Sequence, residues 1–103
     1  MMKAIRLVEN LRARAILEQE PRYDVMLYGK KFFQLYFNMR GYTGYLPVPP
    51  ETPEGKVLCL TLGEGGISRF KKEVPVLNRE WEEFKKNNPE WEPTVENGGI
   101  RKD

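Results

Sequence analysis

Residues 23–48 read YDVMLYGKKFFQLYFNMRGYTGYLPV, and this stretch decides the fold. Aromatic and aliphatic residues alternate along it with polar ones, which is typical of half-buried β-strands. Gly29-Lys30-Lys31 supplies a first turn and Arg40-Gly41 a second, because glycine adopts the backbone angles that tight turns need. The stretch therefore predicts antiparallel strands joined as a meander.

The register across the first turn follows from asking which pairing places apolar residues opposite one another. A two-residue loop would set Val25 opposite Gln34, which mixes an apolar and a polar partner. A three-residue loop gives only apolar pairs, namely Leu27–Phe33, Val25–Leu35 and Tyr23–Phe37. We therefore predict the longer loop.

Closing the second turn at Arg40-Gly41 completes two faces of the predicted meander. This register also pairs Leu35 with Leu46 and Tyr36 with Tyr45. Gly44 would then face Phe37, where the absent side chain leaves room for the ring. The apolar face consists of Val25, Leu27, Phe33, Leu35, Phe37 and Leu46. The opposite face carries Tyr28, Phe32, Tyr36 and Tyr45.

A helix is predicted before the meander, over residues 2–19. Apolar residues recur there at helical spacing and make one stripe. The stripe residues are Ala4, Leu7, Val8, Leu11 and Ala15. Pro21 ends the pattern, because the residue before a proline is driven away from helical backbone angles.

The chain after the meander predicts a loop, a strand and a second helix. The proline-rich residues 47–55 favour an extended loop, and Lys56–Leu62 predicts a fourth strand. Ser68 is the expected cap of a helix that ends by Asn88. Its apolar stripe is Ile67, Phe70, Val74, Leu77, Trp81 and Phe84. Pro75 falls inside this stripe and is expected to kink the helix or divide it in two.

The sequence thus predicts an α+β fold. Its parts are an N-terminal helix, a four-stranded antiparallel sheet and a C-terminal amphipathic helix kinked near Pro75. We expect a single domain over residues 1–88 and a flexible acidic tail over residues 89–103, where no periodic pattern is visible and glycines occur near the end.

Composition argues against most catalytic chemistry. The 103 residues include no histidine, which removes the commonest general base and metal ligand. The one cysteine, Cys59, has no internal disulfide partner, and its apolar surroundings predict a buried thiol. We therefore expect a protein that is not an enzyme and that uses no metal and no cofactor.

Charge and hydropathy restrict the compartment and the partner. The formal net charge of +2 is too small to indicate nucleic acid by itself. The first residues lack a signal-peptide pattern, and no apolar run approaches the roughly 20 residues of a membrane span. We expect a cytoplasmic protein without membrane contact.

Three short motifs have a functional interpretation and a structural one. Gly63–Ser68 resembles a phosphate-binding loop but lacks its lysine, so a strand-to-helix turn is favoured. Pro47–Pro53 contains PxxP spacing, which we interpret as a loop rather than a ligand. Arg40–Leu46 is similar to an RNA-recognition signature with one extra residue, and we interpret it as a turn and strand.

The candidate binding site is the tyrosine-rich face with the cations of the two turns. It consists of Tyr28, Lys30, Lys31, Phe32, Tyr36, Arg40 and Tyr45. If both predicted helices cover the apolar face, this aromatic face is open to a partner. If the helices cover opposite faces, the tyrosines belong to the core edge. Both arrangements remain open from sequence.

The Tyr28–Tyr45 hairpin pair and the stripe of Phe70, Leu77 and Trp81 resemble small accessory proteins of phages and mobile elements, anti-CRISPR inhibitors among them. The resemblance implies a protein that binds and blocks a large host machine, such as a CRISPR–Cas defence nuclease. Many such inhibitors are strongly acidic, and this chain is not, so docking by shape is expected rather than charge mimicry.

The leading hypothesis is accordingly a non-catalytic binding protein whose partner is a protein or a protein–nucleic-acid complex. The alternative is a single-stranded nucleic-acid-binding protein that uses the same aromatic surface for base stacking. Salt separates the two, because phosphate contacts weaken steeply with ionic strength. A small-molecule enzyme is a third hypothesis and would need a deep pocket with convergent polar groups.

Overall fold

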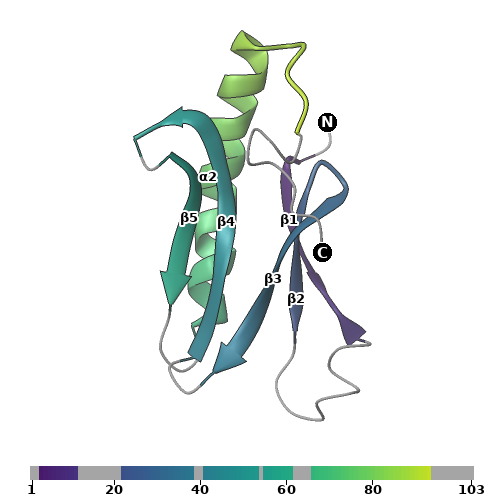
Figure 1. Cartoon of the computed structure of the whole chain (residues 1–103), viewed down its shortest axis with the longest axis vertical. Coiled ribbons are helices and arrows are strands. Elements are labelled where there is room, and N and C mark those ends of the chain that lie inside the picture. The colour runs from purple at the N-terminus through teal and green to yellow at the C-terminus, as the bar shows by residue number, and fades with distance from the viewer. Residues whose placement is uncertain (1–2, 12–21, 39–40, 54, 62–65, 94–103) are drawn as a thin grey trace.

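The computed structural model describes residues 3–11, 22–38, 41–53, 55–61 and 66–93. These residues form a five-stranded antiparallel sheet in sequential strand order, followed by one long helix (Figure 1). The strands are β1 (Ile5–Glu9), β2 (Tyr23–Leu27), β3 (Lys30–Asn38), β4 (Gly41–Thr52) and β5 (Gly55–Thr61), and the helix is α2 (Ile67–Asn87). The predicted meander is therefore present, with one more strand than expected.

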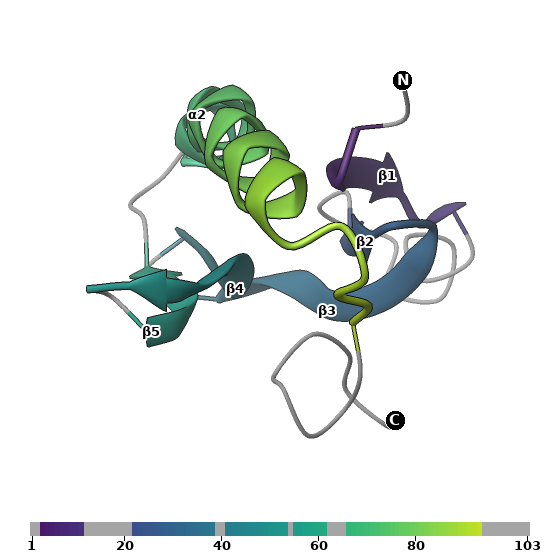
Figure 2. The ribbon, with the colours of Figure 1, turned by 90° about the horizontal axis from the view of Figure 1, so that it is seen from above.

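The helix α2 lies on one face of the sheet, where it packs against β1 and β4 (Figure 2). It contributes four buried side chains, which are Phe70, Leu77, Trp81 and Phe84. The sheet contributes the other buried apolar residues of the core, including Ile5, Val25, Leu27, Phe32, Leu35, Tyr42, Leu46 and Val48. The core thus lies between one layer of helix and one layer of sheet.

The N-terminal helix predicted over residues 2–19 is wrong, since β1 stands at its start and pairs with β2. Short apolar runs fit a strand period as well as a helical one. In β1, Ile5 is fully buried and Arg6 is exposed, which is the alternation of a strand. Residues 12–19 of the predicted helix lie outside the described residues.

A side chain of α2 holds β1 in place. The Nδ2 group of Asn78 donates a hydrogen bond of 3.0 Å to the carbonyl of Ile5, and the N–H of Ile5 donates one of 2.7 Å to Oδ1 of Asn78. The amide of Asn78 therefore pairs with Ile5 as the backbone of a neighbouring strand would. This long-range contact stabilises a strand over a helix, and local sequence does not reveal it.

The first turn is shorter than predicted. Leu27 pairs with Lys30, so the loop contains only Tyr28 and Gly29. Both have positive φ, 50° for Tyr28 and 80° for Gly29, as the type I′ turn of a two-residue hairpin requires. A tyrosine in this backbone region is uncommon. The sequence pattern favoured a longer loop because that loop would pair only apolar residues across the two strands.

A β-bulge then shifts the register of β2 and β3. Val25 pairs with Phe33 but Met26 pairs with Lys31, so Phe32 is the extra residue on β3. The predicted pairs Leu27–Phe33, Val25–Leu35 and Tyr23–Phe37 are therefore wrong. Apolar matching missed the register because a bulge changes the pairing by one residue within the strand.

The second turn closes one residue earlier in the chain than predicted. Tyr36 pairs with Thr43, and Asn38 pairs with Gly41. This register replaces the predicted pairs of Leu35 with Leu46 and of Tyr36 with Tyr45. It also places Gly44 against Leu35 rather than Phe37, and an added Cβ at Gly44 would lie 2.1 Å from Cδ2 of Leu35. The close approach predicted for this glycine is real, but its partner is different.

The proline-rich residues 47–55, predicted as a loop, belong to the β4–β5 hairpin. The strand β4 continues through them to Thr52, which pairs with Gly55. Pairing is irregular between Pro47 and Thr52, where prolines without an N–H group are tolerated. Pro47 is fully buried, and its carbonyl accepts a hydrogen bond of 3.0 Å from Nε1 of Trp81.

The C-terminal amphipathic helix is confirmed, with Ile67 as its first residue. Pro75 lies inside one continuous helix, so the alternative of two separate helices is wrong. Gly66 occupies the N-cap position without a side-chain hydrogen bond, and Ser68 is therefore not the cap. The predicted stripe is the buried face of α2, as expected from its helical spacing.

We predict that Gly44→Ala destabilises the protein. The new methyl group would collide with Leu35, which is fully buried, and overpacking of a core typically costs about 1–3 kcal/mol. Urea denaturation of both proteins measures the difference in free energy of unfolding.

The double variant Leu35→Ala/Gly44→Ala serves as the control. Against the Leu35→Ala background, which lacks the colliding methyl group, Gly44→Ala should have almost no effect. An equal loss of stability in both backgrounds would contradict the steric explanation.

Candidate functional site

The face of the sheet turned away from α2 brings together residues from β3, β4 and β5. Pairing places Tyr36 beside Thr43, Thr43 beside Thr61, and Tyr45 beside Cys59. The residues of β4 that alternate with these are buried, so this group points to the opposite side. We call Tyr36, Thr43, Tyr45, Cys59 and Thr61 the outer face.

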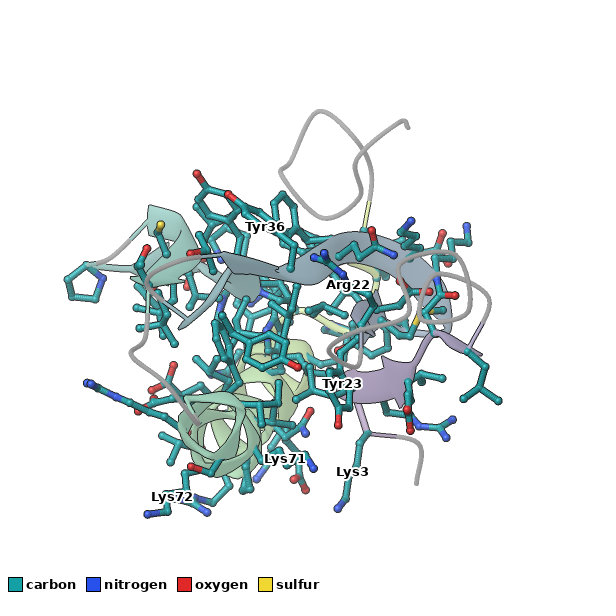
Figure 3. The ribbon with its side chains drawn as sticks, turned by 90° about the horizontal axis from the view of Figure 1, so that it is seen from below. Lys3, Arg22, Tyr23, Tyr36, Lys71 and Lys72 are labelled. Atoms are coloured by element: carbon teal, nitrogen blue, oxygen red, sulfur yellow. The ribbon has the colours of Figure 1, made fainter. Side chains whose placement is uncertain are left out.

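Aromatic rings dominate the outer face. Tyr36 is 41% exposed and projects from the side of the sheet opposite α2 (Figure 3). The Tyr45 ring is held edge-on by Phe33, with 4.7 Å between the ring centroids and 81° between the planes. An aromatic pair of this geometry stabilises by roughly 0.5–1.5 kcal/mol beyond burial. Tyr45 therefore presents a fixed ring, whereas Tyr36 presents an exposed one.

The structure separates the seven residues predicted for the binding site. Tyr36 and Tyr45 lie on the outer face, as predicted. Phe32 is only 2% exposed and belongs to the core, because the bulge between β2 and β3 turns it inward. Lys31 is exposed, and Arg40 lies outside the described residues.

The other two predicted residues, Tyr28 and Lys30, lie at a different place. Both line a small groove of about 270 Å³ that also contains Lys85 and Trp91. Tyr28 does not face the same way as Tyr36, because its ring packs on α2. The predicted surface is thus divided between the outer face and the turn of the β2–β3 hairpin.

Four aromatic side chains meet at this hairpin turn, and we call them the aromatic corner. They are Tyr28, Trp81, Phe84 and Trp91. The Tyr28 and Trp81 rings are perpendicular with centroids 6.0 Å apart, and those of Trp81 and Trp91 are 5.1 Å apart. Burial in this corner raises the pKa of the Tyr28 hydroxyl, because the charged phenolate is poorly solvated there.

Trp91 connects the C-terminal segment to the domain. Sequence left open whether this residue docks on the domain or anchors a partner, and the structure shows docking. The ammonium group of Lys85 donates a hydrogen bond to the carbonyl of Trp91, next to the ring contacts with Trp81 and Phe84. Residues 94–103 of the predicted tail lie outside the described residues.

Arg22 directly precedes Tyr23, whose partner Leu35 directly precedes Tyr36, so this cation lies near Tyr36 (Figure 3). Lys31 precedes Tyr36 by five residues on β3, which is about 17 Å along a strand. Lys3, Lys71 and Lys72 lie on the side of α2, and Tyr36 lies on the other side of the sheet (Figure 3). Lys71 instead stands over the ring of Tyr23, 5.4 Å from its centroid.

Another groove lies between α2, the residues just before β1 and the hairpin turn. Its volume is about 600 Å³, and its lining is Lys3, Ala4, Tyr28, Asn78, Glu82, Lys85 and Lys86. Asn78 is engaged with the backbone of Ile5, and Lys85 with that of Trp91. These two polar groups hold the fold rather than converge on a common point in the groove.

The described residues contain no group of three or more His, Cys, Asp or Glu side chains placed to hold a metal ion. Among the same residues, no helix is long and apolar enough to cross a membrane.

Sequence reasoning missed three members of the outer face. Cys59 was expected to be buried and is exposed, because it pairs with Tyr45 on the outer side of β5. Thr43 and Thr61 lie beside each other for the same reason. The alternation of β5 carried the signal, since Leu58 and Leu60 on either side of Cys59 face inward.

A scan against protein-family models gives no match, and searches for similar curated proteins and similar solved structures give none either.

We predict that Tyr28→Phe reduces the loss of stability at alkaline pH. The native protein holds the Tyr28 proton more tightly than the unfolded chain, whose pKa is about 10.0. This contribution is complete below that pH and is lost as the pH rises through the raised native pKa. Phenylalanine cannot ionise, so the variant lacks this contribution to the pH dependence.

Urea denaturation between neutral pH and values above 10.0 measures this difference. The free energy of unfolding of the wild-type protein should fall more steeply than that of Tyr28→Phe. Parallel curves would show that ionisation of Tyr28 is not coupled to folding.

Proposed function

We propose that this chain is a non-catalytic binding protein that docks a protein partner on its outer face. The observation that supports the proposal is the exposed ring of Tyr36, which shares with the fixed ring of Tyr45 a sheet face that α2 does not cover. Tyrosine is among the residues that most often dominate interface energy. Its ring offers a large contact area, and its hydroxyl offers a hydrogen bond.

The rest of the outer face suits the rim of a protein interface. Thr43 and Thr61 supply small polar side chains next to the rings, and Cys59 adds a small apolar one. A rigid sheet also presents these groups with little conformational freedom to lose on binding. These properties favour docking by shape complementarity.

The distribution of charge favours a protein over single-stranded nucleic acid as the partner. A nucleic-acid surface combines stacking rings with cations that follow the phosphates. Here Arg22 lies near Tyr36, whereas the exposed lysines Lys3, Lys71 and Lys72 lie on the α2 side, away from Tyr36 (Figure 3). Stacking at Tyr36 and phosphate contacts at these lysines would require a strand to pass around the edge of the sheet.

The resemblance to phage and mobile-element accessory proteins adds a specific role to this proposal. In that role the outer face binds a large host machine, such as a CRISPR–Cas nuclease, and blocks it in the cytoplasm. The resemblance supports this specific role, and the geometry does not. Identification of the partner tests it.

We predict that Tyr36→Glu abolishes partner binding without unfolding the domain. Loss of an interface hot spot costs about 2 kcal/mol or more, which weakens binding at least about 30-fold. The matched control is Val76→Glu, because Val76 is 40% exposed and lies on α2 rather than on the sheet.

The measurement begins with capture from the native host by the wild-type protein and both variants, with and without nuclease, read by quantitative mass spectrometry. The dissociation constant of the captured protein is then measured at low and high salt. We expect Tyr36→Glu to lose the partner, Val76→Glu to retain it, and salt to have little effect. Equal binding by both variants would overturn the outer-face proposal, and loss of the partner on nuclease treatment would favour nucleic acid.

A further inference from the structure

The two edges of the sheet are protected to different degrees. At the β1 edge, the side chain of Asn78 occupies both backbone groups of Ile5, and Arg6 and Glu9 place charges along the strand. Blocked backbone groups and charged residues are the usual means by which proteins prevent an edge strand from pairing with another chain. The β1 edge is therefore closed over part of its length.

The β5 edge lacks these features. Its sequence is GKVLCLT, with no proline and with Lys56 as its one charged residue. No described element lies beside it on the side away from β4, as Figures 1 and 2 agree. Val57 is 37% exposed, Cys59 is exposed, and Leu58 and Leu60 are only partly buried. An apolar edge of this kind is a template for strand pairing.

We propose that β5 pairs with β5 of a second copy of this chain, antiparallel and related by a two-fold axis at Cys59. Side chains at paired positions lie on the same face of a sheet. A two-fold axis that passes through a residue therefore pairs inward-facing residues with inward-facing residues. With the axis at Cys59, Leu58 of one chain lies opposite Leu60 of the other. The two partly buried leucines then pack against each other across the two chains.

Charge also fits a pair of identical strands in this register. Lys56 is the second residue of β5, three residues before Cys59. The axis at Cys59 therefore separates the two lysine positions by six residues along the strands, about 20 Å. This exceeds the Debye length of about 8 Å at physiological salt, so the like charges barely repel.

The pairing would join the two five-stranded sheets into one. Both outer faces would then lie on the same side of the joined sheet, because paired residues share a face. A dimer of this kind would offer two Tyr36 rings to a partner with two equivalent sites, and bivalent attachment strengthens binding without new contacts. This inference concerns the sheet edge and does not depend on the partner proposed for the outer face.

Sedimentation equilibrium of the full chain tests the oligomeric state. We expect a mass twice the 12.1 kDa of one chain, in the presence of reductant. The variant Leu60→Lys places charge at the paired edge, and we expect it to sediment as a monomer. The control Val76→Lys adds the same charge on α2 and should remain dimeric. A wild-type protein that is monomeric at all concentrations overturns the proposal.

Thiol cross-linking tests the register. Diamide takes up the hydrogens of two thiols as they form a disulfide, and pairing raises the effective concentration of the Cys59 thiols to the millimolar range. At micromolar protein concentration we expect the rate of disulfide formation in the wild-type protein to be about 100-fold higher than in the variant Val57→Cys/Cys59→Ser. In the second protein the introduced thiol lies opposite Thr61 of the other chain, so it has no thiol partner.

A mixture provides the positive control. Val57→Cys/Cys59→Ser mixed with Thr61→Cys/Cys59→Ser should form a covalent heterodimer rapidly, while each alone should not. A dimer in which Cys59 cross-links no faster than these single-thiol controls overturns pairing through β5. Because no partner is present, the outcome is separate from the Tyr36 experiment, and Tyr36→Glu should dimerise normally.

Discussion

The hydrogen bond and ring contacts of Trp81 connect the separate parts of this structure. Its indole N–H donates to the carbonyl of Pro47, which ties α2 to the middle of β4. Its ring, 1% exposed, contacts Tyr28 of the hairpin turn and Trp91 of the C-terminal segment. A buried indole needs a partner for its N–H, so the position of Pro47 also determines where α2 lies on the sheet.

The outer face follows from this arrangement. With α2 held on one side by Trp81, the alternating residues of β3 and β4 divide into a covered set and an uncovered one. Tyr36 and Tyr45 fall into the uncovered set. The bulge turns Phe32 away from the uncovered set and into the core. Burying a phenylalanine ring stabilises the fold more than leaving it at the surface does. The proposed binding surface is therefore smaller and less basic than the alternation alone indicates.

The two sheet edges show how one helix side chain changes the behaviour of a strand. The side-chain amide of Asn78 forms hydrogen bonds with both backbone groups of Ile5 and closes part of the β1 edge. Both edges carry alternating apolar residues, but β1 also carries the charged residues Arg6 and Glu9, whereas β5 carries only Lys56. The position of the helix adds to this difference and leaves β5 as the edge available to a second chain.

Sequence alone determined the meander and the amphipathic helix at Ile67–Asn87, because each follows from local periodicity. Tertiary structure decided that Ile5–Glu9 is a strand, since Asn78, distant in sequence, supplies its hydrogen bonds. It also decided which predicted site residues share a surface, because a bulge and a two-residue turn shift the register. Those features arise from contacts between strands, which periodicity within one strand does not contain.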